Sequence, residues 1–332
     1  MKLSELGEFG LINILSKIVE DSRDPQSPQW KNMVAGIGDD AAAWKNKRGL
    51  TLATTDCLVE NIHFKPGQSS WRDLGWKALA VNLSDIAAMG GKAGYALVTI
   101  GLPREAEVES IIDLYEGIIE LGNMWGVAIA GGDITSSEKF IISLTVTGNS
   151  GKHLLRRSSA RPGDIIAVTG NPGMAAAGYK LIEDGIEETE TDAPLRQAFL
   201  RPSPRLAEGI AICASGSRTA IDISDGLVAD LGHICNSSGT GARINTDLIP
   251  VHPTARKIFP DQALDMALGG GEDYELLFTA EAQIIEKVKR TTSTRVTVIG
   301  EVTTGPAGVV NVIDENGRPY RVEKAGWDHF GK

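Results

Sequence analysis

The chain has 332 residues and carries 43 acidic against 33 basic side chains, which gives a formal net charge of −10. A chain of this length is expected to form about two domains, each large enough to bury its own core. With 42% hydrophobic and 23% charged residues, the composition excludes a disordered chain. The acidic balance argues against a nucleic-acid partner, because a phosphate backbone needs a basic surface.

The sequence also argues against a membrane protein. No apolar stretch approaches the roughly 20 residues that a membrane-spanning helix needs, and the first residues, MKLSELGEFGLINIL, lack the basic-then-apolar layout of a signal peptide. The three cysteines, at positions 57, 213 and 235, form no CxxC motif and cannot all pair, which favours a reducing compartment. We therefore expect a cytoplasmic protein with no membrane partner.

Hydrophobic periodicity predicts helices alternating with strands along the first half of the chain. Helices are expected over residues 8–19, 71–88 and 105–125, and Gly126 ends the last of these. Short apolar runs predict strands at residues 50–54, 94–101, 127–130 and 139–147.

A second series of elements follows a turn-rich stretch and begins with the strand DIIAVTG at 164–170. Further strands are expected at 219–223, 274–279, 295–302 and 308–313, and helices at 173–184, 226–236 and 281–290. Asn316-Gly317 indicates a hairpin turn between the last short strands. The sequence therefore predicts an α/β protein with two α/β domains, residues 1–149 and residues 150–332.

Several aspartates stand beside glycines or near the ends of predicted strands. They are Asp39 and Asp40 in GIGDDAA, Asp56 after LTLATT, Asp85 in NLSDIAAMGG, Asp133 after VAIAGG, and Asp222 and Asp225 in AIDISDG. Ligands of α/β folds gather outside the carboxyl ends of strands, so these carboxylates would converge if their strands share a sheet. An aspartate can also cap a helix or close an Asx-turn, and this is our interpretation of Asp40 and Asp230.

Carboxylates that lie close together raise each other's pKa unless a cation separates them. Oxygen ligands, without Cys or His at ligand spacing, favour Mg²⁺ or Mn²⁺ over zinc. Thr54 and Thr55 add further oxygens next to Asp56. An acidic cleft of this kind would bind phosphates through bridging divalent ions.

The common nucleotide-binding and hydrolase motifs are missing from the sequence. It contains no GxxxxGK[ST], GxGxxG, HRD kinase loop, HExxH or GxSxG. This disfavours P-loop kinases, protein kinases, dehydrogenases, zincins and serine hydrolases.

Seven motifs occur along the chain in the order GIGDDAA, TTDCLVENIHF, KALAVNLSDIAAMGG, GGD, LLRRSSA, DISDG and GGGEDYELLF. Together they resemble the thiamine-monophosphate kinase family, of the superfamily that includes aminoimidazole ribonucleotide synthetase. The resemblance runs from Glu8 to the GWDHF near the C-terminus. It implies that ATP phosphorylates thiamine monophosphate to thiamine diphosphate by direct in-line transfer. It also implies a homodimer in which the N-terminal domains join their sheets into a barrel.

The same resemblance implies a set of binding residues and no catalytic side chain, because metal ions and positioning would accomplish the transfer. The Mg²⁺ ligands would be Asp39, Thr54, Thr55, Asp56, Asp85, Asp133, Asp222 and Asp225. ATP would contact Gly132, Asp133, Tyr115, Arg157 and Ser224. Thiamine monophosphate would contact His63, Glu272 and Trp327. Glu272 would either accept a hydrogen bond from the aminopyrimidine or offset the thiazolium charge, whereas Trp327 would offer a π face to either ring.

Two positions depart from the family pattern, which often has glycine where Asn61 and Ser159 stand. Asn tolerates a positive φ, so the first change is mild, whereas Ser159 would affect the loop that aims Arg157. The alternatives to a thiamine-monophosphate kinase are another ATP-dependent synthetase of the superfamily, a metal-dependent phosphatase, or a non-catalytic nucleotide binder.

Overall fold

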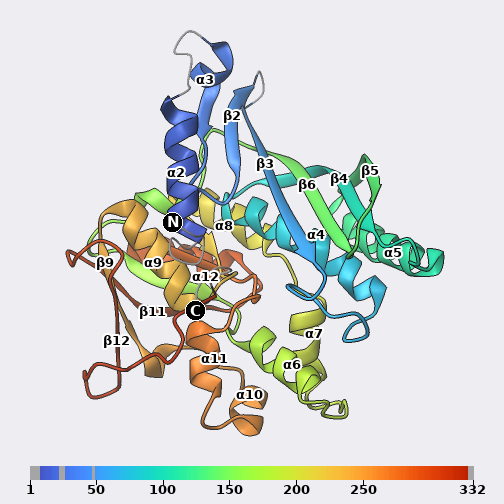
Figure 1. The fold of residues 1–332 in the computed structure, drawn as a ribbon. Helices are drawn as coiled ribbons and strands as arrows, with labels where there is room; N and C mark the ends of the chain where they lie inside the picture. Colours follow the sequence, from blue (N-terminus) through green and yellow to red (C-terminus); the bar gives the residue numbers. More distant parts are fainter. Residues whose placement is uncertain (1–7, 22–26, 47–48, 328–332) are drawn as a thin grey trace.

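The computed structural model describes residues 8–21, 27–46 and 49–327 and contains two six-stranded sheets. The first sheet has the strand order β1-β2-β3-β6-β4-β5. Its strands are Met33–Ala35 (β1), Ala42–Asn46 (β2), Gly49–Val59 (β3), Lys92–Leu102 (β4), Ala128–Ser136 (β5) and Ile141–Ser150 (β6). In Figure 1 this sheet stands at the upper right, coloured blue to green.

The second sheet has the order β12-β9-β11-β7-β10-β8 and contributes the strands at the lower left of Figure 1. Its strands are Ile165–Thr169 (β7), Thr219–Asp222 (β8), Gly241–Asn245 (β9), Leu276–Ala280 (β10), Val296–Thr303 (β11) and Val310–Ile313 (β12). In both sheets most neighbouring strands are antiparallel. The parallel pairs are β4 with β5 and β9 with β12.

Helices surround the two sheets. The α-helices are Glu8–Asp21 (α2), Pro28–Asn32 (α3), Trp71–Ala88 (α4), Val108–Trp125 (α5), Met174–Glu183 (α6), Ala193–Leu200 (α7), Leu206–Ser215 (α8), Leu227–Ser238 (α9), Pro253–Ile258 (α10), Ala263–Gly269 (α11) and Ala282–Thr291 (α12). Two short 3₁₀ turns are Arg157–Ser159 (η1) and Thr246–Leu248 (η2). Within the described ranges, no helix combines the length and the apolarity that crossing a membrane requires.

Helix α4 joins the two halves of the molecule. It packs against β3 and β6 of the first sheet and against α8 and β8 of the second half. Nearly all of its residues from Leu74 to Ala88 are buried, as is typical of a helix whose small and apolar residues occur all round its axis. Side chains that point from α4 into a cavity are therefore held on a rigid support.

Two glycines allow α4 and α5 to approach closely. A Cβ atom on Gly75 would lie 1.9 Å from the carbonyl oxygen of Leu114, and one on Gly117 would lie 1.9 Å from that of Arg72. Only glycine permits such a backbone-to-backbone contact. These residues therefore fix how the helix pair covers the first sheet.

The α/β class and the long elements predicted from the sequence are confirmed, including a helix at 71–88. The sheets are nevertheless mainly antiparallel. Strand β3 is also longer than expected, and Asp56 therefore lies within it and not beyond its end. The Asn316-Gly317 turn was expected between the last two short strands, but it follows β12 and joins Ile313 to Pro319. Short elements without clear periodicity, such as β1, β2, β9, α7 and α8, were not predicted.

Gly117→Ala is expected to lower the free energy of unfolding by about 1–3 kcal/mol, because the new methyl group would force α4 and α5 apart. The measurement is urea denaturation followed by circular dichroism. Gly151→Ala is the matched control, since a Cβ atom there meets no atom within 4 Å. Equal losses in the two variants would contradict the proposed role of the close helix contact.

Candidate functional site

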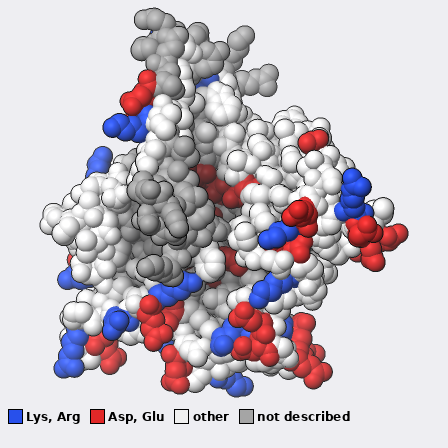
Figure 2. Space-filling view, in the orientation of Figure 1, with Lys and Arg blue, Asp and Glu red and all other residues white. Residues whose placement is uncertain are grey.

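A cavity of about 610 Å³ is lined by residues from both halves of the chain. Figure 2 shows acidic side chains inside a hollow near the middle of this face. The cavity contains most of the site residues predicted from the sequence: Asp39, Thr54, Thr55, Asp56, His63, Asp85, Arg157, Asp222, Ser224, Asp225, Glu272 and Trp327.

Three carboxylates from three different elements meet in this cavity. Asp40 precedes β2, Asp85 lies on α4 and Asp222 ends β8, and each offers an oxygen within 4.8 Å of those of the others. Burial and the neighbouring Asp40 carboxylate raise the pKa of Asp222 to about 8. Burial and the charges of Asp56 and Asp222 raise the pKa of Asp85 well above its usual value. The charged form of this cluster is therefore unstable without a cation.

Strand β3 adds side chains to the cluster by its alternating geometry. Thr54 and Asp56 are two residues apart and point to the same face of the sheet, and the Thr54 hydroxyl donates a hydrogen bond to Asp85 Oδ2. Burial raises the pKa of Asp56. Thr55 lies between them, and its hydroxyl donates to the Leu144 carbonyl across the strand pair at 3.0 Å. Thr54 and Asp56 therefore interact with Asp85, whereas the Thr55 hydroxyl is engaged by the neighbouring strand.

Asp40 is not the capping or turn residue that the sequence suggested. Its Oδ1 accepts a hydrogen bond from Arg157 Nη2 at 2.8 Å, and its Oδ2 is buried without a hydrogen-bond partner. Asp39, which the sequence favoured, accepts from the backbone N–H of Arg157 at 2.9 Å, and burial raises its pKa. An orphaned, buried carboxylate oxygen is an atom that a cation would satisfy. The pair of aspartates in GIGDDAA was the sequence signal for this role.

Arg157 is positioned by contacts on both sides of η1. Burial works against its charge, but the carboxylates of Asp40, Asp222 and Asp230 together outweigh burial and raise the pKa of the guanidinium. The Ser238 hydroxyl donates to the Arg157 carbonyl at 2.8 Å and accepts from the Ala160 N–H at 3.1 Å. These bonds anchor the loop from helix α9, so Ser159 does not leave Arg157 without support.

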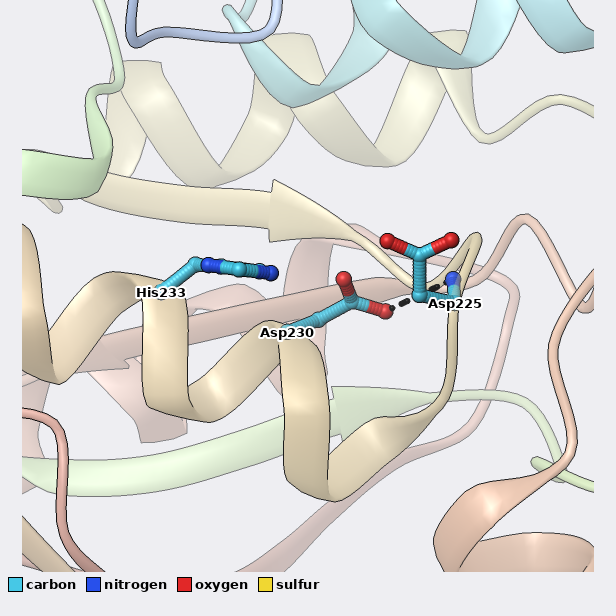
Figure 3. A group of neighbouring side chains, drawn as sticks. All are labelled: Asp225, Asp230 and His233. Atoms are coloured by element: carbon cyan, nitrogen blue, oxygen red, sulfur yellow. Dashed lines mark hydrogen bonds between the residues drawn. The ribbon is translucent and has the colours of Figure 1, made fainter. Parts of the chain in front are cut away.

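The DISDG loop is organised by Asp230, as the sequence suggested. Its Oδ2 accepts hydrogen bonds from the backbone N–H groups of Ser224, Asp225 and Gly226, at 3.1, 3.2 and 3.0 Å. Figure 3 shows Asp225 on the loop above Asp230, with His233 further along α9. Burial and Arg157 lower the pKa of His233 to about 4, so its imidazole is neutral. Sequence reasoning gave this histidine no role, although it lines the cavity.

The residues expected to contact thiamine monophosphate lie around the same cavity. His63 follows a turn in which Asn61 has a φ of 62°, as its tolerance of positive φ allows, and His63 Nδ1 accepts from the Val59 N–H at 3.1 Å. The Trp327 side chain is half exposed, and Lys324 Nζ lies 4.5 Å from its ring centroid. This contact shows that the indole face accommodates a cation. Lys77, which the sequence did not single out, pairs with Glu272 at 2.6 Å.

Three predicted residues lie outside the cavity lining in this single chain. Gly132 and Asp133 are exposed on β5, at the edge of the first sheet. A Cβ atom on Gly132 would lie 1.8 Å from the Val98 carbonyl oxygen, so strand packing alone requires this glycine. Tyr115 is half-buried on α5 and packs against the core of the first half. The structure therefore does not bring these residues to the carboxylate cluster.

Comparisons with known proteins identify relatives over nearly the whole chain. Residues 38–149 match the model of AIR synthase related protein, N-terminal domain, and residues 161–313 match that of the C-terminal domain. The chain is 39% identical to the thiamine-monophosphate kinase of Escherichia coli K12, with 98% of each protein covered. It is 34% identical to that of Bacillus subtilis 168, with 98% of this chain and 100% of the relative covered.

Solved structures give the same picture. The structure described as "AaThiL complexed with AMPPCP and TMP" matches with a TM-score of 0.85 and 33% identity, covering 99% of both chains. The thiamine-monophosphate kinase from Stenotrophomonas maltophilia K279a matches with a TM-score of 0.75 and 34% identity, covering 92% of this chain and 96% of the other.

The raised pKa values predict how stability depends on pH. Asp222 has a pKa of about 8 in the folded protein against a usual value of 3.8, so between these values the folded state binds more protons than the unfolded state. Stability contributed by this proton is lost as the pH rises towards about 8. We expect the Tm of chelator-treated protein to fall by a few degrees from pH 6 to about pH 8, because over this span folded Asp222 still holds a proton that the unfolded state has lost.

Millimolar MgCl₂ should reverse this loss, and more strongly at the higher pH, because divalent ions compensate the ionised carboxylates. Differential scanning fluorimetry measures the effect, with NaCl at equal ionic strength as the control. A Tm that responds equally to both salts would rule out a specific cation site.

Proposed function

The chain belongs to the thiamine-monophosphate kinase family, and on that premise we propose that it transfers the γ-phosphoryl group of ATP to thiamine monophosphate, forming thiamine diphosphate. The observation that carries the proposal is the crowded carboxylate cluster of Asp40, Asp85 and Asp222 with Arg157 beside it. Such a cluster repels free phosphates but binds them when divalent cations lie between the two sets of charges.

The residues of the cluster fit magnesium. Asp40 offers a buried oxygen without a partner, and the carboxylate and hydroxyl oxygens of Asp56, Asp85, Asp222 and Thr54 complete a set of hard ligands. Asp39, Thr55, Asp133 and Asp225 are kept as further proposed ligands. Bound Mg²⁺ would neutralise charge on the phosphates of both substrates.

The chain's own residues would orient the reactants. Arg157 stays charged and presents fixed donors to phosphate oxygens, and Ser224 lies on a loop that Asp230 holds in place. The acceptor phosphate is already anionic at neutral pH, so the transfer needs no general base. We therefore propose direct in-line transfer, in which catalysis comes from positioning and electrostatics.

The organic part of the acceptor would occupy the other end of the cavity. His63, Glu272 and Trp327 line the cavity, as do the aromatic side chains of Tyr179 and Phe199. Flat aromatic faces suit the thiazolium and pyrimidine rings of thiamine monophosphate.

Asp56→Asn, Asp85→Asn and Asp225→Asn are each expected to lower kcat at least about 100-fold, because each removes one charged ligand from the proposed array. The assay incubates the protein with ATP, Mg²⁺ and thiamine monophosphate and separates the products. Asp261→Asn, on an exposed carboxylate outside the cavity lining, is the control. Inorganic phosphate without thiamine diphosphate would favour the phosphatase alternative, and wild-type rates in all three variants would overturn the metal array.

We also propose that the protein is a homodimer joined through the first sheet. Along β4, Tyr95 and Leu97 are 63% and 49% exposed, whereas Ala96 and Val98 between and beside them are buried. On the neighbouring edge strand β5, Ile134 is 66% exposed. An apolar sheet face next to an unpaired edge is typical of an interface. A second copy there would face Gly132 and Asp133, which gives them a route to a nucleotide.

In this proposal residues 1–149 form the dimerising metal- and ATP-binding domain, and residues 150–332 complete the ATP and substrate site. The compartment would be the cytoplasm, where the free cysteines Cys57, Cys213 and Cys235 stay reduced.

Leu97→Asp is expected to shift the protein from dimer to monomer, because the buried interface would then contain an unpaired charge. Sedimentation velocity measures the change. Ile186→Asp is the matched control, since Ile186 is similarly exposed, at 44%, but lies after α6 far from the first sheet along the chain. A wild-type protein that sediments as a monomer at micromolar concentration would contradict the proposed interface.

A further inference from the structure

Lys77 is a buried lysine in the wall of the cavity. Its side chain is only 6% exposed, and its Nζ lies 2.6 Å from Glu272 Oε1. Glu272, at 35% exposure, remains accessible from the cavity. The proposed substrate-binding carboxylate is therefore already engaged by a cation of the protein itself.

The ammonium group of Lys77 is fixed by its surroundings. Helix α4 is buried along its length, and Lys77 Nζ lies 3.8 Å from the ring centroid of Phe199. The Phe199 ring is buried and packs against the ring of Tyr179, with centroids 5.2 Å apart. A cation over an aromatic face is stabilised in place.

The backbone around Glu272 fixes this residue as firmly as the surrounding side chains fix Lys77. Glu272 has a φ of 66°, a conformation that side-chain-bearing residues rarely adopt, and its N–H donates to the Ser224 carbonyl at 2.7 Å. The next residue, Asp273, accepts hydrogen bonds from the N–H groups of Gly173 and Ala175 at 2.7 and 3.1 Å. Such strained positions persist only where the surrounding contacts determine them.

Resting on the proposed function, we infer that Lys77 is a positioning residue that determines acceptor specificity: it makes Glu272 a hydrogen-bond acceptor for the neutral amino group of the pyrimidine, not a counter-ion for the thiazolium. The sequence left these two roles of Glu272 open.

The physical reason is the balance of charges at the pair. An organic cation that approaches Glu272 is attracted by the carboxylate but repelled by the ammonium 2.6 Å from it, so the net attraction is small. A carboxylate has lone pairs for about four hydrogen bonds, and Lys77 occupies one of them. The remaining capacity suits a neutral N–H donor, which the ammonium does not repel.

The test is calorimetric titration with three acceptors that differ by one feature each. They are thiamine monophosphate, an analogue with hydrogen in place of the pyrimidine amino group, and an analogue with a neutral thiophene ring in place of the thiazolium. The proteins are wild type, Lys77→Met, the charge-neutral double variant Lys77→Met with Glu272→Met, and Lys65→Met as control. Lys65 lines the same cavity but pairs with Glu183, at 3.8 Å.

In wild type, removal of the amino group should raise Kd about tenfold or more, because it leaves Glu272 without its donor. The double variant should lose the preference for the acceptor that carries the amino group. It should keep the wild-type ratio of the dissociation constants of the thiophene and thiazolium acceptors. Lys77→Met should increase the preference for the thiazolium acceptor over the thiophene acceptor about tenfold, because Glu272 then acts as an uncompensated anion. Lys65→Met should leave both ratios as in wild type.

Two results would overturn the inference. One is a wild-type Kd that does not depend on the amino group, and the other is a thiazolium preference that disappears in the double variant. Since the readout is a ratio of dissociation constants within one protein, a general loss of stability does not imitate it. The double variant keeps the question decidable if Lys77→Met alone fails to fold.

The proposed function has a separate readout. Failure of the wild-type protein to form thiamine diphosphate from ATP and thiamine monophosphate would overturn that function, while the binding ratios would still decide the role of Glu272. Failure of the wild type to bind any of the three acceptors would overturn both.

Discussion

Repulsion between buried carboxylates is the constraint on which the site depends. Asp40, Asp85 and Asp222 come from the segment before β2, from α4 and from β8, so both halves of the chain must fold before the cluster exists. Burial removes the solvation that carboxylates need, and each charge makes its neighbours harder to ionise. The site is therefore unfavourable by itself and becomes favourable only when positive charge enters with the ligand. Arg157 supplies part of that charge from within the chain.

Helix α4 converts this constraint into a cavity with two different ends. Lys77, Val81 and Asp85 follow one another at intervals of four residues and thus share a face of the helix. The rise of an α-helix separates the first from the last by about 12 Å. Asp85 stands among carboxylates, whereas Lys77 stands among aromatic rings with a single carboxylate partner. One rigid helix thereby sets the distance between the part of the cavity suited to phosphates and the part suited to an organic ring.

What could be predicted from the sequence depends on whether its cause was local. Helix α4 follows from its own residues. The motifs around Asp56, Asp85 and Asp222 indicated a common site, and these three residues line one cavity. The roles of Asp40 and Lys77 could not be predicted, because their partners are remote: Arg157 is 117 residues from Asp40 along the chain, and Glu272 lies on a different half from Lys77. Antiparallel pairing was missed for the same reason, since periodicity identifies a strand but not its neighbour.

Asp40 and Asp230 show why the chemistry of a carboxylate follows from the groups that its oxygens meet. Both were interpreted as capping residues, and both are buried. One oxygen of Asp230 accepts three backbone N–H groups, which ties this residue to the conformation of its loop. Asp40 instead shares one oxygen with Arg157 and keeps the other without a partner. The first residue is structural because its acceptor capacity is used by the chain, and the second is suited to a cation because part of its capacity is left. Glu272 lies between these cases, since Lys77 removes its excess charge while leaving lone pairs for a neutral donor.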